Sequence, residues 1–289
     1  MPSRMWSRQR SGSVVCPSCG RLVGVKDASC FHCGRPNPGL WGFSRALRAL
    51  GEGFGFAPLV MTACGILYLA ALLLDPAGIG GRGGFSIFSP SLKSLFTLGA
   101  SGSVPVFGMG RWWTVLSAAW LHGGVLHILF NMLWVRNLAP ATAQLFGPAR
   151  VVLIYTAASV GGFALSSLAG VLLPFLPQVL RGAQFTVGAS APVFGLLGAL
   201  VLYGQRTGSS MVGSQALGYA VILGLFGFIM PGIDNWAHLG GFLGGYGAAA
   251  ILDPRLPERL DHLLAALACL VATAAAVVAS VLTALPVMR

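Results

Sequence analysis

The chain has 289 residues, of which 55% are hydrophobic and 9% are charged, and its formal net charge is +11. Charged residues make up about a quarter of an ordinary soluble domain, so this composition excludes a typical soluble enzyme. It indicates a multi-pass membrane protein. Anionic inner-leaflet lipid explains the positive charge without any role for nucleic acid.

The first 50 residues differ from the rest of the chain. They hold eight of the 18 Lys and Arg residues and four of the six cysteines, and they contain no long apolar run. The cysteines form two C-x-x-C pairs separated by ten residues, namely Cys16 with Cys19 and Cys30 with Cys33. Four thiolates at this spacing suit tetrahedral zinc, and a glycine after each pair allows the tight turns that such a site needs.

Zinc would supply the folding free energy of this head, because about 20 residues cannot bury a core of their own. A redox pair and disulfides are the alternatives, and a reducing cytoplasm disfavours disulfides. We predict that His32 is not a ligand. The head, residues 1–38, resembles a zinc ribbon, and a basic linker with the stretch Arg45–Arg48 follows over residues 39–56. Binding of a cytoplasmic partner is one role open to the head.

Seven apolar stretches approach the roughly 20 residues that cross a bilayer. They cover about residues 57–74, 113–135, 151–173, 187–203, 215–230, 236–252 and 263–285. The fourth to the sixth are short and rich in glycine. Short helices end within the bilayer, which lets water and a catalytic group meet beneath its surface.

Residues 75–111 form a long loop between the first two stretches. A loop of this length is usually functional or disordered. Its phenylalanines at positions 85, 88, 96 and 107 predict an element that is partly embedded at the membrane interface.

Basic residues predict the orientation, because cytoplasmic loops carry an excess of Lys and Arg. An inside N-terminus puts 13 basic residues on the cytoplasmic side and five on the outer side. Seven spans then put the C-terminus outside. Ser190 opens the fourth stretch and His238 lies near the start of the sixth, so both are expected at matching depth below the outer face.

Ser190 and His238 are candidate functional residues because polar groups at membrane depth are costly without a partner or a wet cavity. A serine hydroxyl becomes nucleophilic when an adjacent base takes its proton, and histidine suits that task near neutral pH. His127 and Asn131 lie four residues apart and therefore share one helix face. His122 lies on a different face, and we assign it a structural hydrogen bond. The alternative for His122, His127 and Asn131 is that they form a polar seam between helices.

Four separated motifs carry a family resemblance. They are Gly110-Arg111-Trp112-Trp113, the run HGGVLHILFNM from His122, Gly188-Ala189-Ser190-Ala191, and Ala237-His238-Leu239-Gly240-Gly241. In this order they resemble the rhomboid intramembrane serine proteases over about residues 57–252. The resemblance implies an all-α membrane fold with a six-helix catalytic core. A loop and a seventh transmembrane helix, residues 253–289, would follow the core.

The resemblance also implies a Ser/His dyad without a third carboxylate. Ser190 would be the nucleophile and His238 the general base and later acid. His127, Asn131 and the Ser190 backbone N–H would form the oxyanion hole. Supporting positions are His122, Gly188, Phe194, Gly241 and Arg111.

Several of these positions carry an alternative or a departure from the family pattern. Phe194 stands where family members often have a tyrosine that stacks on the histidine, and a phenyl ring can still stack. Pro192 removes one candidate oxyanion donor but is tolerated in a first helical turn. Asp234 is the one acid near the histidine motif and could orient the imidazole, a role that the family pattern does not give it. Arg111 with its two tryptophans also fits a simple interfacial aromatic belt.

The implied function is cleavage of single-pass or multi-pass membrane proteins near the outer face of the bilayer, with the chain in a bacterial inner membrane. Two other functions are considered. One is an inactive relative that binds transmembrane clients, and the other is a transporter that uses the polar seam. Transporters usually show internal repeats with broken helices in matching positions, and the sequence has no such symmetry.

Overall fold

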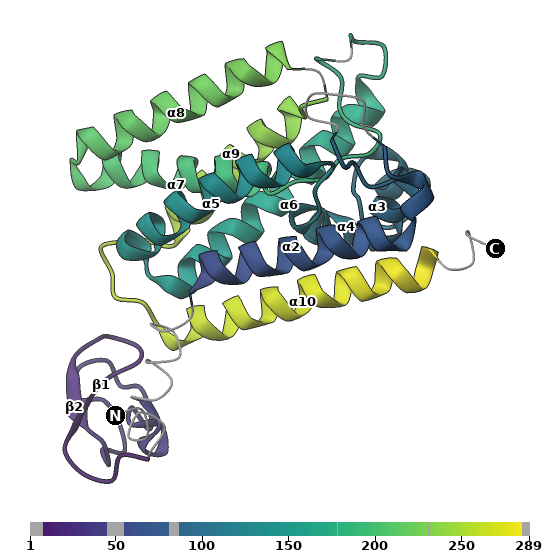
Figure 1. Cartoon of the computed structure of the whole chain (residues 1–289). Helices are drawn as coiled ribbons and strands as arrows, with labels where there is room; N and C mark the ends of the chain where they lie inside the picture. The colour runs from purple at the N-terminus through teal and green to yellow at the C-terminus, as the bar shows by residue number, and fades with distance from the viewer. Residues whose placement is uncertain (1–7, 45–54, 81–86, 178, 231, 285–289) are drawn as a thin grey trace.

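The computed structural model describes residues 8–44, 55–80, 87–177, 179–230 and 232–284. It shows a helical bundle with a small head beyond one end (Figure 1). The predicted all-α membrane architecture is confirmed. Four helices of the described chain are long and apolar enough to cross a membrane, or five if one bent pair counts as a single span. The predicted basic stretch Arg45–Arg48 lies outside the described residues.

The head is built on two short strands, β1 (Ser13–Val15) and β2 (Leu22–Gly24), which pair antiparallel with Val14 opposite Val23. A short 3-10 turn, η1 (Leu40–Gly42), follows. The buried apolar residues of the head are Val14, Cys16, Val23, Val25 and Cys30. Two of these five are cysteines of the predicted metal site, so the core of the head and that site coincide.

Long helices form the bundle. They are α2 (Phe56–Leu74), α5 (Val125–Phe146), α6 (Pro148–Leu172), α7 (Ser190–Thr207), α8 (Ser210–Ile229), α9 (Asn235–Ile251) and α10 (Leu260–Ala284). Helices α7 and α9 have 18 and 17 residues and are short, as predicted, whereas α8 has 20 residues. Pro192 lies in the first turn of α7, where proline is tolerated.

The prediction of one continuous second span over residues 113–135 is wrong. The chain forms α4 (Thr114–Ser117) and the turn η5 (Ala118–Trp120), breaks, and restarts as α5 at an angle of 94°. The break contains Gly123 and Gly124. Each glycine costs a helix about 1 kcal/mol relative to alanine. Helix α5 also continues beyond the predicted end to Phe146, so Arg136 lies within this helix and not in a loop after it.

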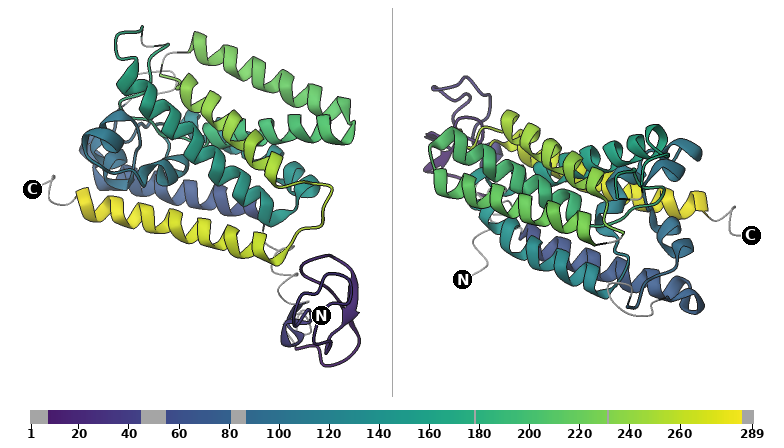
Figure 2. Two further views of the ribbon diagram at one scale, coloured as in Figure 1. Left: turned by 180° about the vertical axis from the view of Figure 1, so that it is seen from behind. Right: turned by 90° about the horizontal axis from the view of Figure 1, so that it is seen from above.

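Helices α6, α7 and α9 pack closely in the middle of the bundle (Figure 2). Glycines allow this approach. A Cβ atom on Gly241 would collide with the backbone of Ala191, and one on Gly245 would collide with the backbone of Gly195. The contact moves from Ala191 to Gly195 on α7 as it moves from Gly241 to Gly245 on α9, so the two helices run parallel. The contact between these helices that the glycine spacing predicts is therefore present.

The loop before α4 has structure of its own. It contains η2 (Pro76–Gly78), α3 (Leu92–Leu98) and the π-helical turn η4 (Val104–Gly108). Ser101 and Thr186 exchange two backbone hydrogen bonds of 3.0 and 2.8 Å, which join this loop to the segment before α7. Phe88 and Phe107 are exposed, Phe96 is half-buried, and Phe85 lies outside the described residues. Embedding of the loop in the interface stays a prediction.

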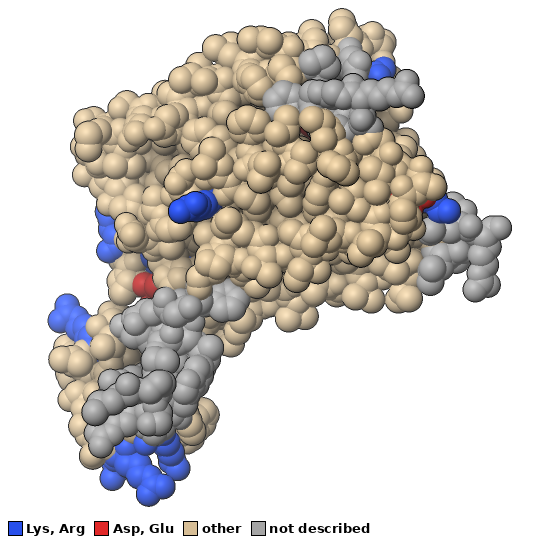
Figure 3. All heavy atoms as spheres, in the orientation of Figure 1, with Lys and Arg blue, Asp and Glu red and all other residues tan. Residues whose placement is uncertain are grey.

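Lys and Arg side chains gather on the head, whereas the bundle surface in the same view is almost bare of charge (Figure 3). The large side chains that the bundle exposes are mainly hydrophobic. Examples are Leu73, Ile222, Ile229 and Val271. An apolar surface of this kind is favourable in contact with lipid and unfavourable in water, in agreement with the membrane assignment.

Candidate active site

Ser190 is the first residue of α7, and the segment before it is held tightly. The Gly188 amide donates to the Ala118 carbonyl at 2.9 Å, and the Ala189 amide donates to His122 Nε2 at 3.5 Å. Gly188 has φ +136°, and a Cβ atom there would lie 2.7 Å from His127 Nε2. Only glycine suits this position. Its backbone conformation sets the direction in which the chain enters the helix that begins with Ser190.

His238 lies in the first turn of α9 and is buried. Its ring stacks on the Phe194 ring, with centroids 4.2 Å apart and planes inclined by 16°. The stacking expected at this position is therefore present without the tyrosine hydroxyl. Because Phe194 belongs to the helix that Ser190 opens, the contact ties the candidate base to the helix of the candidate nucleophile.

Ser190 and His238 lie on the first turns of two parallel helices whose backbones touch at Ala191 and Gly241. No hydrogen bond joins the two side chains in the described chain, and His238 Nδ1 has no hydrogen-bond partner there. Catalytic hydrogen bonds are often long or misaligned without substrate and tighten on binding.

The other polar residues gather at the break before α5. The Gly123 amide donates to His127 Nδ1 at 3.2 Å, and the rings of His122 and His127 have centroids 5.2 Å apart. A Cβ atom on Gly188 would be close to both His127 Nε2 and Ser190 Oγ, at 2.7 and 3.6 Å. His127 thus lies beside the segment that leads into Ser190. The buried Asn131 amide instead donates to the His127 carbonyl at 2.9 Å, within its own helix.

Asp234 has a role that the sequence did not reveal. It is the N-cap of α9, and its carboxylate accepts hydrogen bonds from the Ala237 amide and the Ser166 hydroxyl at 3.0 and 2.6 Å. These bonds occupy both oxygens, whereas His238 Nδ1 has no partner. The Asp234 carboxylate therefore does not bond to the His238 imidazole. The sequence did contain a signal for the capping role, because aspartate is favoured at the N-cap of a helix and Asp234 lies just before the predicted one.

Arg111 is buried and links the loop before α4 to α10. Its guanidinium donates to the carbonyls of Phe96 and Ser280 at 3.0 and 2.7 Å and lies 4.1 Å from the centre of the Phe96 ring. Trp113 Nε1 donates to Ser280 Oγ at 3.1 Å, while Trp112 is exposed. Arg111 is thus a structural residue, and a simple interfacial belt does not describe it.

Comparison with known families gives one decisive match. The family model of the rhomboid domain matches residues 109–255, which contain Ser190, His238, His127 and Asn131. The chain belongs to the rhomboid family. The rhomboid domain thus covers α4 to α9, and the family assignment made from the four motifs is confirmed.

Several curated rhomboid proteins are similar to this chain. RHOMBOID-like protein 4 of Arabidopsis thaliana is 35% identical over 55% of this chain and 39% of its own length. Rhomboid protease GluP of Bacillus subtilis is 32% identical over 57% of this chain and 30% of its own length. RHOMBOID-like protein 5 of Arabidopsis thaliana is 32% identical over 58% and 53%. The chain therefore spans about half or less of the length of these relatives.

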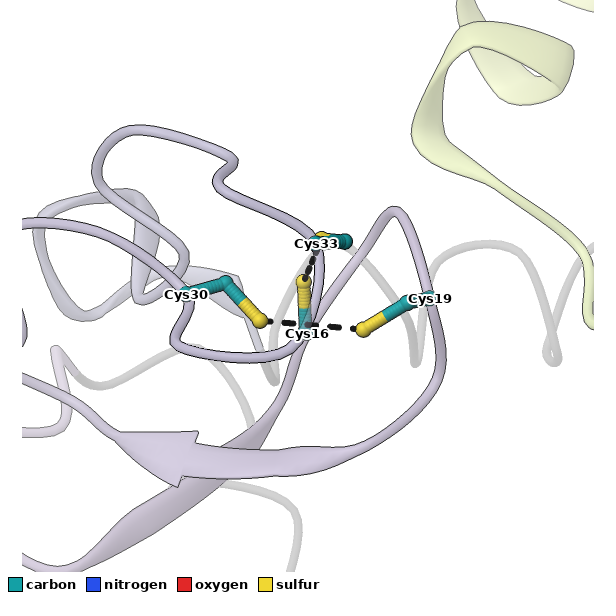
Figure 4. A group of neighbouring side chains, drawn as sticks. All are labelled: Cys16, Cys19, Cys30 and Cys33. Carbon is teal, nitrogen blue, oxygen red and sulfur yellow. Dashed lines mark hydrogen bonds between the residues drawn. The ribbon is translucent and has the colours of Figure 1, made fainter.

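A second site lies in the head, outside the rhomboid domain. The sulfur atoms of Cys16, Cys19, Cys30 and Cys33 all lie within 4.8 Å of one another and point to a common centre (Figure 4). The Cys16–Cys33 and Cys19–Cys30 Sγ distances are 3.8 and 3.7 Å, and the four thiols are free in this structure. These four cysteines could hold a metal ion.

The thiols of this cluster are not equivalent. Burial raises the pKa of Cys30, but hydrogen bonds from the His32 and Cys33 backbone outweigh it and hold that pKa at about 7. For Cys33, a backbone hydrogen bond from Arg35 lowers the pKa, and burial with the three neighbouring thiols raises it to about 12. The ring of the exposed His32 contacts the Phe31 ring at a tilt of 41°, and His32 is not part of the cluster.

Proposed function

We propose that this rhomboid protein is an intramembrane serine endopeptidase that cleaves transmembrane proteins near the outer membrane face. The observation that carries the proposal is the pairing of two helix starts: Ser190 opens α7, His238 lies in the first turn of α9, and Phe194 of α7 stacks on the His238 ring. Family membership and the similarity to rhomboid protease GluP support the same activity.

In the proposed mechanism His238 takes the Ser190 hydroxyl proton while Oγ attacks the scissile carbonyl carbon. The developing oxyanion accepts hydrogen bonds from His127, Asn131 and the Ser190 amide, at the positive end of the α7 dipole. The peptide C–N bond then breaks, and His238 gives its proton to the departing amine. A water that His238 deprotonates hydrolyses the acyl-enzyme and releases Ser190.

The Asn131 side-chain NH2 group donates one hydrogen to the His127 carbonyl, and its second hydrogen can donate to the oxyanion. A rotation about the side-chain torsions that aims this hydrogen at the oxyanion is a small change compared with movement of a helix. We infer that this donor is completed when substrate binds.

The membrane arrangement proposed for this activity follows the positive-inside rule. The N-terminal head faces the cytoplasm of a bacterial cell, and α7 and α9 begin on the outer side of the inner membrane. The scissile bond must be extended to reach Ser190, so we predict that substrates carry helix-breaking or small residues near their outer boundary. Cleavage of an unbroken poly-Leu helix at the same rate would contradict this prediction.

We also propose that the metal of the head is zinc with a structural role. Four thiolates about 2.3 Å from a tetrahedral zinc ion lie about 3.8 Å apart, which matches the Cys16–Cys33 and Cys19–Cys30 Sγ distances of 3.8 and 3.7 Å. Zinc would stabilise all four cysteines as thiolates and fix the turns that contain Gly20 and Gly34. The cluster lies outside the rhomboid domain, so we assign the ion no part in peptide cleavage.

The test of the protease activity is cleavage of a tagged single-pass substrate in proteoliposomes. Wild type is expected to cleave, and Ser190→Ala and His238→Ala are expected to lose activity by several orders of magnitude. A fluorophosphonate probe should label Ser190 in wild type and not in His238→Ala. Equal cleavage by all three proteins would refute the proposal. Absence of cleavage and of labelling in all three would favour the alternative, an inactive protein that binds transmembrane clients.

A further inference from the structure

Asp234 connects the histidine helix to the rest of the bundle. Its Oδ1 caps α9 through the Ala237 amide at 3.0 Å, and its Oδ2 accepts from the Ser166 hydroxyl at 2.6 Å. The His238 amide donates to the Asp234 carbonyl at 3.1 Å. One residue therefore fixes the first turn of α9, in which His238 lies, and attaches that turn to α6.

Ser166 extends the connection to the nucleophile segment. It is completely buried on α6, and while its proton goes to Asp234, its oxygen accepts from the Ala183 amide at 3.2 Å. The neighbouring Gly182 packs directly on α6, since a Cβ atom there would collide with the backbone of Ser166 and Gly170. The chain is thus pressed onto α6 a few residues before Ser190.

The segment from Ala183 to Ser190 has little freedom to absorb a shift. The Ser103 amide donates to the Ala183 carbonyl at 3.0 Å, Thr186 pairs with Ser101, and the Gly188 amide is bonded at 2.9 Å. A displacement at Ala183 would therefore be transmitted toward Ser190. The two hydrogen bonds of Ser166 join this segment to the first turn of α9.

We propose that Asp234 and Ser166 are positioning residues that set the distance between Ser190 and His238, an inference that rests on the proposed Ser/His dyad. Neither side chain touches the reacting atoms. They act through the first turn of α9 and the segment that begins at Ala183, which are both bonded to Ser166 of α6. A displacement of about 1 Å in an active site can cost about 100-fold in rate.

The experiment compares Asp234→Ala, Asp234→Asn, Ser166→Ala and the double variant Asp234→Ala/Ser166→Ala with wild type. kcat and KM are measured with the single-pass substrate in proteoliposomes, together with the labelling rate of Ser190 and the thermal unfolding midpoint. Ser91→Ala is the matched control, because Ser91 is also an N-cap and accepts from the Ser94 amide at 3.1 Å, but on α3. Ser190→Ala and His238→Ala are included throughout.

Asp234→Ala is expected to lower kcat and the labelling rate by about 10- to 100-fold, with KM within about twofold because substrate contacts are unchanged. Asp234→Asn should lose less, since an amide oxygen still caps Ala237. Ser166→Ala should lower kcat as well, and the double variant should lose no more than Asp234→Ala, since both residues act through one connection.

A wild-type kcat in Asp234→Ala, or additive losses in the double variant, would overturn the inference while leaving the proposed protease intact. The inference is also overturned if the activity lost in Asp234→Ala is no more than its loss of folded protein accounts for, as in Ser91→Ala. If Asp234→Ala does not fold, Asp234→Asn and Ser166→Ala decide by the same criteria. Cleavage that persists in Ser190→Ala would instead refute the protease proposal itself.

Discussion

The imidazole of the proposed dyad needs its ring fixed, and no carboxylate among the described residues bonds to it. His238 Nδ1 has no hydrogen-bond partner in the described chain, while the ring face lies 4.2 Å from that of Phe194. The backbone of His238 is fixed by the capped first turn of α9, and Phe194 limits the rotation of its side chain. In the proposed mechanism, the Phe194 ring would take over part of the orienting task that a third catalytic residue performs elsewhere.

Phe194→Ala is expected to reduce fluorophosphonate labelling of Ser190 by at least about 10-fold, because a misoriented base transfers protons poorly. The lost packing should also cost about 3–5 kcal/mol of stability. Phe194→Tyr keeps the stacked ring and should label within about threefold of wild type. The measurements are labelling rate and thermal unfolding of the detergent-solubilised protein.

Leu200→Ala is the matched control for this prediction. Leu200 is buried on the same helix, six residues or about 9 Å further along. Its truncation should lower stability while the labelling rate of the remaining folded protein is retained. If Phe194→Ala and Leu200→Ala label at the same rate per folded molecule, the ring has no orienting role.

At the scale of elements, the site depends on how closely α7 and α9 approach each other. Glycine at Gly195, Gly241 and Gly245 leaves no side chain between the two backbones. Dispersion contacts between closely packed backbones replace the hydrophobic driving force, which is absent between helices in lipid. The axial register of the pair therefore sets the relative height of Ser190 and His238.

Gly245→Ala is expected to destabilise the protein, because the new Cβ would collide with the backbone of Gly195. Gly247→Ala on the same helix is the control, since a Cβ there meets nothing within 4 Å. That substitution should be neutral or stabilising by up to about 1 kcal/mol. Thermal unfolding and Ser190 labelling measure both variants. Equal midpoints would show that α9 is free to move away from α7 at no cost.

The comparison between sequence and structure differs from element to element. Apolar runs predicted α2, α6, α9 and α10 closely, because length and composition decide whether a helix can span a bilayer. The 94° turn before α5 was not predicted. The residues around the turn are mostly apolar, so composition alone does not separate it from a continuous helix. At the turn, Gly123 and Gly124 interrupt the helix, and the His122 and His127 side chains accept hydrogen bonds from backbone amides.

Within the candidate site, the four motifs predicted which residues gather but not how their side chains are bonded. The stacking of Phe194 on His238 could be expected from their positions, and it is present. The bond from Asp234 to Ser166 joins residues 68 positions apart in the chain. A pairing of that separation depends on the packing of α6 against α9, which local patterns do not encode.

At the scale of the whole molecule, the head meets the bundle at the connection between α9 and α10. The Leu260 amide donates to the Pro17 carbonyl at 3.0 Å, and a Cβ atom on Gly20 would lie 3.1 Å from Pro257. Arg150 at the start of α6 holds this connection by donating to the carbonyls of Leu256 and Pro257 at 2.8 and 2.9 Å. The head thus rests on a connection that is itself anchored to the membrane helices.

Cys16→Ser, or treatment with a zinc chelator, is expected to unfold the head and leave cleavage by the membrane domain within about threefold of wild type. The head would lose the core that the proposed zinc ion holds together. The contact with the bundle lies beyond the far end of α9, and the part of this helix from His238 to Ile251 is about 20 Å long. Hydrogen exchange of residues 13–38, zinc content per chain and proteoliposome cleavage are measured together.

Cys269→Ala serves as the control, because Cys269 lies on α10 and is not part of the cluster. This variant should keep one zinc per chain and a protected head, whereas Cys16→Ser should lose both. If cleavage falls in parallel with zinc in Cys16→Ser and not in Cys269→Ala, the head controls the active site through the α9–α10 connection. The cysteine cluster and the Ser190/His238 site would then be coupled despite the distance along α9, and the predicted independence of the two sites would be wrong.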